Sequence, residues 1–518
     1  MPGSPLAELE ALRRAGEHRA VRERGTRLAR SMPEAWGPVA EACRAEGDAP
    51  AAIAAATSHV AACPGDGRAW QGLGASLLMG RRPAEAVVAL EQAVARASTA
   101  GALADLGLAL REAGRPVDAR GVLDRAVEAD RESVGARLGR ASLSSWRGDH
   151  ASALVDLEAA LLTAPWDPRL LGARASALRG LGRLDEALAV LVEARRLAPQ
   201  DPRLAWNEAL TLLAAGRFEE GFAAYGVRRA RSRQRGARLL PGISRWSGQP
   251  LSGRRIVVHA EQGFGDSLQF VRFASDLAAR DAEVVVLAPA RLGAMLRRVP
   301  GVSEVLARGD EPPVADFQVG MMDVPGLLGL GAADLGRAVP YLHAEAAAVD
   351  TWGRRLPDAD VRVGIGWQGN PDFEADHLRS PPLSAFAPLA ACRGAAFVCL
   401  QQRHGREQLP RSPLPMVDIA TELDQGQDGF VDTAAVLASL SLVITSDTAL
   451  AHLSGAMGRP TWVVLPHAAD WRWMVARPDS PWYPGMRLFR QPAPGAWRPV
   501  FEAVAAALGR VLTGEESP

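Results

Sequence analysis

The chain has 518 residues, of which 48% are hydrophobic and 23% are charged, and its acidic and basic side chains balance at a formal net charge of +0. This length exceeds one ordinary domain, and the composition is that of a globular protein without polyelectrolyte character. Nucleic acid is therefore not an expected partner, and the absence of lysine excludes chemistry that needs a lysine Schiff base.

Neither a metal site nor a membrane segment is indicated. The cysteines form no CxxC pair and no dense framework, so they are expected to be buried thiols in a reducing compartment rather than zinc ligands; they are Cys43, Cys63, Cys392 and Cys399. The first residues contain neither an apolar h-region nor a small-residue cleavage site, so we expect no secretory signal, and no window approaches 18 uninterrupted apolar residues. We expect a cytoplasmic protein, and its exclusive use of arginine suggests a GC-rich bacterial genome.

The amino-terminal half is repetitive. Glycines recur at intervals of 34 residues, and a small residue follows each by five or six positions; the glycines are Gly80, Gly114, Gly148, Gly182 and Gly216. Weaker copies surround Gly16 and Gly47. This period resembles the tetratricopeptide repeat and implies about seven helical hairpins over residues 5–232, stacked into a right-handed superhelix. Such an array is typical of protein or peptide recognition, although a spacer or a dimerisation element would have the same pattern.

The carboxy-terminal half follows a linker at residues 233–249 and alternates buried strands with helices. The predicted strands are residues 255–259, 283–287, 361–367, 397–400, 442–445 and 461–465. This alternation predicts parallel α/β sheets in two Rossmann-like lobes, residues 250–350 and 356–496, with ligands bound at the carboxyl ends of the strands. A last helix at residues 497–513 is expected to pack back on the first lobe.

The first strand of this half leads into a glycine-rich turn, Glu261-Gln262-Gly263-Phe264-Gly265-Asp266, and then a helix expected at residues 267–277. The two glycines allow a sharp turn and the close approach of a substrate. Asp266 either caps this helix or faces the cleft.

A second strand-to-helix turn, Ser446-Asp447-Thr448, precedes His452. Free N–H groups at a helix start favour an anion such as pyrophosphate. Alternatively, Asp447 is a plain N-cap and His452 is a hydrogen-bonded core histidine.

A third turn holds Gly369 and Asn370, followed by Arg379, whose guanidinium either neutralises a donor phosphate or is exposed to solvent. Aromatic side chains near residues 471–483 either stack on a base or sugar or pack between the lobes. The Asp358-Ala359-Asp360 triplet precedes a strand and is interpreted as a linker turn.

Several segments together resemble bacterial proteins that join tetratricopeptide repeats to a heptosyltransferase-like module. These segments are HAEQGFGDSLQFVRF, GIGWQGNP, ITSDTALAHLSGAMGRPTWVVLP, DWRWM and SPWYPGMRLFRQ. The resemblance implies a GT-B glycosyltransferase with an acceptor lobe followed by a donor lobe, inverting transfer without an essential metal, and a nucleotide-sugar co-substrate.

The resemblance also assigns roles to residues. Asp266 matches the general base of that family, with Glu261, Gln262, Gly263 and Gly265 in the acceptor-side loop, whereas Asp447, Thr448 and His452 match its donor-lobe motif. Gly369, Asn370 and Arg379 complete the expected donor-binding set. The chain departs from the family pattern at Ala449, where glycine is usual, and in having no lysine in the donor lobe, which argues against a heptose donor.

Three functions are compatible with these features. The first is a protein glycosyltransferase whose repeats select the acceptor, because the combination resembles nucleocytoplasmic O-GlcNAc transferases and bacterial flagellin glycosyltransferases; flagellin is the expected acceptor. The second is a glycosyltransferase of cell-envelope glycans that docks through its repeats. The third is a repeat scaffold whose transferase module is inactive.

Overall fold

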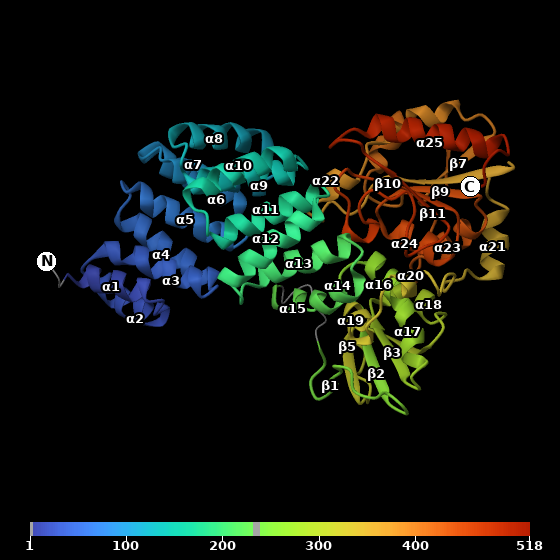
Figure 1. Ribbon diagram of the computed structural model, residues 1–518, viewed down its shortest axis with the longest axis horizontal. Helices are drawn as coiled ribbons and strands as arrows, with labels where there is room; N and C mark the ends of the chain where they lie inside the picture. Colours follow the sequence, from blue (N-terminus) through green and yellow to red (C-terminus); the bar gives the residue numbers. More distant parts are fainter. Residues whose placement is uncertain (1–3, 232–238) are drawn as a thin grey trace. The chain divides into compact units, whose positions relative to one another are not determined.

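A computed structural model describes residues 4–231 and 239–518, so residue 232 at the end of the predicted repeats and residues 233–238 of the predicted linker lie outside the described residues (Figure 1). The chain divides into two compact units, Met1–Ala177 and Leu178–Pro518. The boundary lies inside a repeat helix rather than in the predicted linker at residues 233–249.

Residues 4–231 form seven antiparallel helical hairpins and one further short helix. The hairpin helices are α1 (Pro5–Arg14), α2 (His18–Leu28), α3 (Trp36–Ala45), α4 (Ala49–Ala62), α5 (Gly67–Met79), α6 (Pro83–Arg96), α7 (Ala100–Glu112), α8 (Pro116–Ala129), α9 (Val134–Trp146), α10 (His150–Thr163), α11 (Pro168–Gly180), α12 (Leu184–Leu197), α13 (Pro202–Ala214) and α14 (Phe218–Tyr225). The short helix is α15 (Arg228–Arg231), and a 3-10 turn, η1 (Pro33–Ala35), precedes α3. The predicted number of hairpins matches this part of the chain.

The turn inside each hairpin explains the glycine period. Six of the seven turns contain a glycine with φ between 74 and 79°, a left-handed conformation that costs glycine little; they are Gly16, Gly47, Gly114, Gly148, Gly182 and Gly216. The third hairpin differs by one position. There Arg81 has φ 57°, whereas Gly80 has a right-handed backbone.

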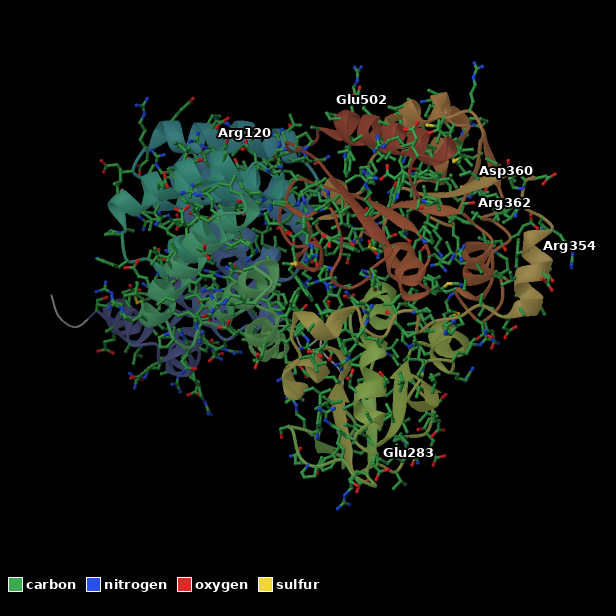
Figure 2. The ribbon with its side chains drawn as sticks, turned by 45° about the vertical axis from the view of Figure 1, so that its right-hand side comes forward. Arg120, Glu283, Arg354, Asp360, Arg362 and Glu502 are labelled. Atoms are coloured by element: carbon green, nitrogen blue, oxygen red, sulfur yellow. The ribbon has the colours of Figure 1, made fainter. Side chains whose placement is uncertain are left out.

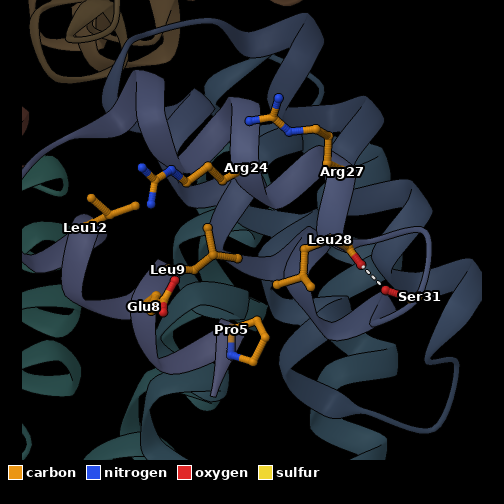
Figure 3. A pocket seen from close by; sticks show the side chains of 8 residues that line it. All are labelled: Pro5, Glu8, Leu9, Leu12, Arg24, Arg27, Leu28 and Ser31. Carbon is orange, nitrogen blue, oxygen red and sulfur yellow. Dashed lines mark hydrogen bonds between the residues drawn. The ribbon is translucent and has the colours of Figure 1, made fainter. Parts of the chain in front are cut away.

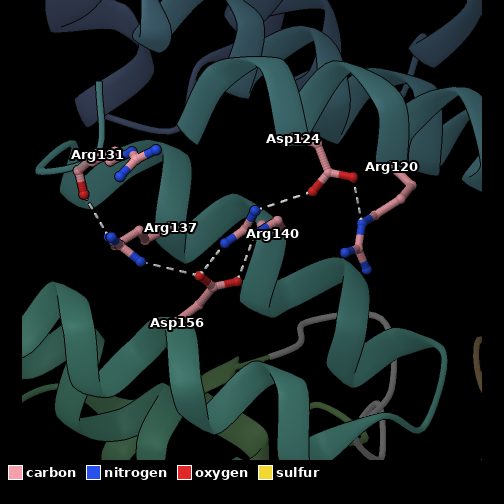
Figure 4. A network of polar contacts seen from close by, with 6 residues as sticks. All are labelled: Arg120, Asp124, Arg131, Arg137, Arg140 and Asp156. Atoms are coloured by element: carbon pink, nitrogen blue, oxygen red, sulfur yellow. Dashed lines mark hydrogen bonds and ion pairs between the residues drawn. The ribbon is translucent and has the colours of Figure 1, made fainter. Parts of the chain in front are cut away.

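Ion pairs connect neighbouring repeats in the first unit (Figure 4). The buried carboxylate of Asp156 in α10 accepts hydrogen bonds from Arg137 at 3.3 Å and from Arg140 at 2.7 Å, both in α9. Arg140 also donates to Asp124 of α8 at 3.1 Å, and Asp124 accepts from Arg120. This network joins α8, α9 and α10 through charged groups that satisfy one another.

The second unit contains two sheets in which every strand pair of the described residues is parallel. The first has the order β1-β5-β2-β3-β4, with β1 (Ser244–Arg245), β2 (Arg255–His259), β3 (Glu283–Ala288), β4 (Val302–Ala307) and β5 (Phe317–Gly320). The second has the order β11-β10-β9-β6-β7-β8, with β6 (Val361–Gly366), β7 (Ala395–Cys399), β8 (Met416–Asp418), β9 (Leu442–Ser446), β10 (Thr461–Leu465) and β11 (Met486–Arg490). The predicted fold class, a helical repeat array followed by an α/β part, is confirmed.

Short helices connect these strands. Those of the first lobe are α16 (Phe264–Phe270), η2 (Val271–Phe273), α17 (Ala274–Ala278), η3 (Ala290–Leu292), α18 (Gly293–Leu296), η4 (Met321–Asp323), α19 (Val324–Leu328) and α20 (Ala332–Leu335). The remaining helices are α21 (Ala346–Gly353), α22 (Asp376–Arg379), η5 (Leu383–Ala391), η6 (Arg406–Arg411), α23 (Val431–Ala438), α24 (Ala449–Ala456), η7 (Trp471–Trp473) and α25 (Trp497–Leu512). The helix expected at residues 267–277 therefore begins three residues earlier and is divided in three.

The last helix, α25, packs on the second lobe, so the expectation that it returns to the first lobe was wrong. It contacts η5 and β11, and its buried side chains belong to the core beneath β6, β7, β9 and β10. For example, Phe501 lies 4.1 Å from Phe386, measured between ring centroids. The apolar face of α25 thus covers one face of the second sheet, the sheet that immediately precedes it in the chain.

The last hairpin belongs to the core of the second unit rather than to a separate array. Phe218, Phe222 and Tyr225 of α14 are buried in one cluster with residues of both lobes. The Phe222 ring lies 6.5 Å from Phe270 of the first lobe and 6.2 Å from Trp482 of the second, between centroids. This cluster explains why the unit boundary falls before α12.

Candidate functional site

The glycine-rich turn and the Asp-Thr turn meet within the second unit. The first leads from β2 to α16, the second leads from β9 to α24, and each follows the carboxyl end of a central strand. A Cβ atom at Gly265 would lie 2.9 Å from Cδ2 of His452 and 3.3 Å from Cα of Ala449. Glycine at this position lets the first turns of α16 and α24 approach each other.

Asp266 is the third residue of α16, and both of its carboxylate oxygens accept hydrogen bonds. Oδ2 accepts from the backbone N–H of Gly263 at 2.8 Å, which is the capping role foreseen for this residue. Oδ1 accepts from Nη2 of Arg472 at 2.5 Å. The side chain remains 20% exposed, so Asp266 both caps the helix and is open to solvent.

In the rest of the acceptor-side loop, one side chain is buried in an ion pair and the residues that follow it are exposed. Glu261 is buried in a bidentate ion pair with Arg228, with distances of 2.8 and 2.9 Å, and Arg228 also contacts Asp323 at 2.5 Å. Gln262 and Gly263 are exposed, and Gln262 has a left-handed backbone with φ 57°. Glu261 therefore anchors the loop from beneath, whereas Gln262 lies at its surface.

Asp447 is buried, and the N-cap of α24 is Thr448 rather than Asp447. The plain N-cap interpretation of Asp447 is therefore wrong. Burial raises the pKa of this carboxyl to about 6, opposed by the positive charges of Arg379 and Arg472. Trp473 also lowers this pKa, although its buried indole N–H has no well-formed hydrogen bond among the described residues.

His452 is the hydrogen-bonded core histidine that the sequence allowed. Its Nδ1 lies 3.0 Å from the hydroxyl of Tyr483, and its ring stacks on Trp473 with centroids 5.5 Å apart. Burial, together with the positive charge of Arg472, lowers its pKa well below the ordinary value. The imidazole is therefore neutral at physiological pH. The hydroxyl of Thr448 lies 3.4 Å from that of Thr445.

The third predicted turn follows β6, the strand beside β9. Arg379 donates from Nε to Asp376 at 3.0 Å, and its guanidinium lies 4.4 Å from the centroid of the Phe373 ring. A Cβ atom at Gly369 would lie 2.6 Å from Nη2 of Arg379. Asn370 is exposed, and its side-chain Oδ1 accepts a local hydrogen bond from the N–H of Asp372 at 3.1 Å. The positive charge of Arg379 lowers the pKa of Asp447.

The aromatic side chains at residues 471–483 pack inside the unit and do not offer open faces to a base or sugar. Trp471, Trp473, Trp482 and Tyr483 are all buried. Trp471 and Trp482 lie in the cluster with α14, and Trp473 covers His452. Of the two interpretations left open by the sequence, packing is the one observed.

Sequence reasoning did not identify Arg472, the charged partner of Asp266, and it placed Asp470 near the end of the second sheet without a partner. Arg472 is buried and donates from Nη1 to Asp470 at 2.9 Å and from Nε to Gln269 at 2.7 Å, in addition to Asp266. The DWRWM segment contains both residues, but nothing in its local pattern pairs it with a turn about 200 residues earlier, and only the fold brings them together.

Other features of the described residues lie away from this site. A cavity of 360 Å³ between α1 and α2 is lined by leucines and by Arg24 and Arg27 and contains none of the predicted residues (Figure 3). Asp360 lies at the surface immediately before β6 (Figure 2), as expected for a linker turn. Across residues 4–231 and 239–518, no cluster of three or more metal-binding side chains occurs, and no helix is long and apolar enough to cross a membrane.

Comparison with known proteins confirms the repeats. Residues 147–206 match the model of the tetratricopeptide repeat family. The chain is also 27% identical over 438 residues to "Protein FlbA" of Caulobacter vibrioides, an alignment that covers 78% of this chain and 72% of that protein. This similarity extends well beyond the repeats.

Two solved structures are similar to parts of this chain. The Cut9–Hcn1 assembly of the APC/C is 20% identical, with a TM-score of 0.38, over 44% of this chain and 46% of that chain. TTC0263, a tetratricopeptide-repeat protein of Thermus thermophilus, is 26% identical, with a TM-score of 0.32, over 34% of this chain and 96% of that chain.

Proposed function

We propose that the second unit is an inverting, nucleotide-sugar-dependent glycosyltransferase of the GT-B type and that the repeats select a protein acceptor. The observation that carries this proposal is the meeting of the Asp266 turn and the Asp447–His452 turn at Gly265. An exposed carboxylate from one parallel sheet thereby lies beside a helix start from the other. Ligands of open α/β sheets bind at such carboxyl ends.

In the proposed reaction Asp266 accepts the proton of an acceptor hydroxyl while that oxygen forms a bond to the anomeric carbon of the donor. The bond between the anomeric carbon and the phosphate oxygen breaks, and the nucleotide leaves with the electron pair. The amino-terminal end of α24, after Thr448, stabilises the negative charge that develops on the phosphate. Asp266 suits the role of base because it is oriented and partly exposed.

Buried polar groups without partners support donor binding on the second lobe. The hydroxyl of Ser446 and the indole N–H of Trp473 are buried and have no hydrogen bond of ordinary geometry within the described residues, and the adjacent Asp447 carboxyl is buried with a raised pKa. Such groups cost free energy unless a ligand satisfies them. We assign them, with Thr448 and His452, to the donor site, and we assign Arg379, beside Gly369 and Asn370, to the donor phosphates.

The acceptor is proposed to be a cytoplasmic protein that binds the repeats, with flagellin as the first candidate. The support for a protein acceptor is the confirmed repeat array, since such arrays present extended surfaces to polypeptides. A cell-envelope glycan is the alternative acceptor.

A thermal-shift experiment with UDP-, GDP-, ADP- and CMP-sugars tests the donor assignment. A ligand at one hundred times its dissociation constant stabilises the folded state by about 2.7 kcal/mol, so the correct donor should raise the melting temperature by several degrees. Asp447→Ala should lose this response, whereas Asp360→Ala, an exposed carboxylate before β6, should keep it. If no donor stabilises the wild-type protein, the repeat-scaffold alternative is favoured.

A further inference from the structure

Arg472 connects the two lobes at the proposed base. It belongs to η7 of the second lobe and is buried, and its three hydrogen-bond acceptors are Asp470 in its own segment and Asp266 and Gln269 in α16 of the first lobe. Burial alone would lower the pKa of this guanidinium, but Asp470 and Asp266 outweigh burial and raise it above the ordinary value. Arg472 therefore carries a permanent positive charge at the junction.

This arginine fixes the orientation of the Asp266 carboxylate. Gly263 holds one oxygen and Arg472 holds the other, so rotation of the side chain would break at least one hydrogen bond to the carboxylate. Gln269 lies about one helical turn beyond Asp266, and its side-chain Oε1 accepts from the same guanidinium. Arg472 thus contacts one face of α16 at two successive turns, which a single charged atom could not do.

The segment that carries Arg472 is itself held rigidly. The centroid of the Trp471 ring lies 4.4 Å from Cζ of Arg472. Trp471 also packs against Tyr225 of the last repeat, with ring centroids 5.8 Å apart. The side chain of Met474 covers the turn at Gly216, where an added Cβ atom would lie 2.6 Å from its methyl carbon. These contacts join the last hairpin to the segment of Arg472, which in turn contacts Asp266.

We propose that Arg472 is a positioning residue for the transfer reaction: it aims the Asp266 carboxylate at the acceptor hydroxyl without itself binding the donor. The inference rests on the proposed function. A catalytic group displaced by about 1 Å loses about 100-fold in rate, which sets the expected effect of removing this support.

The experiment measures transfer to flagellin with whichever nucleotide sugar of the UDP, GDP, ADP and CMP panel supports it, for Arg472→Gln, Arg472→Lys and the control Arg477→Gln. Arg477 lies on the same segment and pairs at the surface with Asp479. Arg472→Gln should lower kcat by about 100-fold while the KM of the donor changes by less than about threefold, because only the transition state needs the aligned base. The kcat of Arg472→Lys should lie between those of wild type and Arg472→Gln, and Arg477→Gln should behave as wild type.

A double-mutant cycle separates positioning from a general loss of structure. Once Asp266→Asn has removed the base, Arg472→Gln should lower residual transfer by less than about threefold. A full 100-fold loss in that background would overturn the inference, as would a raised donor KM with unchanged kcat. If Arg472→Gln fails to fold, a wild-type kcat for Arg472→Lys overturns it equally. A wild-type protein that transfers no sugar refutes the proposed function itself, and the role of Arg472 falls with it.

Discussion

Replacing Phe222 by alanine tests whether the last repeat hairpin is part of the core of the second unit. The ring is 2% exposed and lies among Phe218, Phe270, Trp471 and Trp482, with centroid distances of 5.7 to 6.5 Å. A phenylalanine buries about 150 to 250 Å², and truncation of such a residue costs about 3 to 5 kcal/mol of unfolding free energy. We expect a loss of about 4 kcal/mol for the whole of Leu178–Pro518.

Native-state hydrogen exchange measures this loss at the strands that position the site. Amides of β2 and β9 that exchange only when the unit unfolds should exchange about 1000-fold faster in Phe222→Ala, since 1.4 kcal/mol corresponds to a factor of ten. Trp166→Ala, at a side chain that is 61% exposed in the first unit, should leave these amides unchanged. The reasoning is refuted if Phe222→Ala accelerates exchange only in α13 and α14, because the hairpin would then be a peripheral attachment.

Three further predictions concern the site and its support. Because the pKa of Asp447 is raised to about 6, its protonated form favours folding, and this stabilisation is lost as pH rises through 6. The melting temperature of Asp447→Asn relative to wild type should therefore increase between pH 4 and pH 7. An equal difference in melting temperature at both pH values would contradict the assignment. Gly265→Ala should separate α16 from α24, which should lower the melting temperature and reduce the transfer rate by at least about tenfold. Gly121→Ala, with open space at its Cβ position, should change neither, and equal behaviour of the two variants would show that the contact is dispensable. Glu261→Gln should lower the free energy of urea unfolding by about 3 kcal/mol because it leaves a buried Arg228 partly unpaired. The surface control Glu502→Gln should lower it by less than about 1 kcal/mol. Similar losses in the two variants would rule out a structural ion pair.

The sequence predicts those parts of the fold that have a strong local signal. The glycine period follows from the left-handed turn that every hairpin needs, and the β-branched runs that were identified correspond to interior strands that are wholly or almost wholly buried, such as β9 and β2. Five strands of the described residues were not predicted. Three of them, β1, β4 and β8, are exposed or only partly buried, and the other two, β5 and β11, are mostly buried but lack a continuous β-branched run. The apolar face of α25 was evident, but only the fold determines which lobe it covers.

The site was predictable as motifs but not as contacts. The turns containing Asp266 and Asp447 have recognisable glycines and helix starts, and the fold brings both to one junction. The pairing of Asp266 with Arg472 joins residues 206 positions apart, and no local pattern encodes it. Likewise, Glu261 is sequence-adjacent to the site, yet its charge is neutralised by Arg228 from the repeat side.

The most direct test of the account is the intact mass of flagellin after incubation with the purified protein and each nucleotide sugar. The account predicts a mass gain of one or more sugar residues with one donor, lost in Asp266→Ala and retained in Arg477→Gln. Unmodified flagellin with every donor would contradict flagellin as the acceptor, and the absence of donor hydrolysis in the same samples would contradict glycosyl transfer as the function.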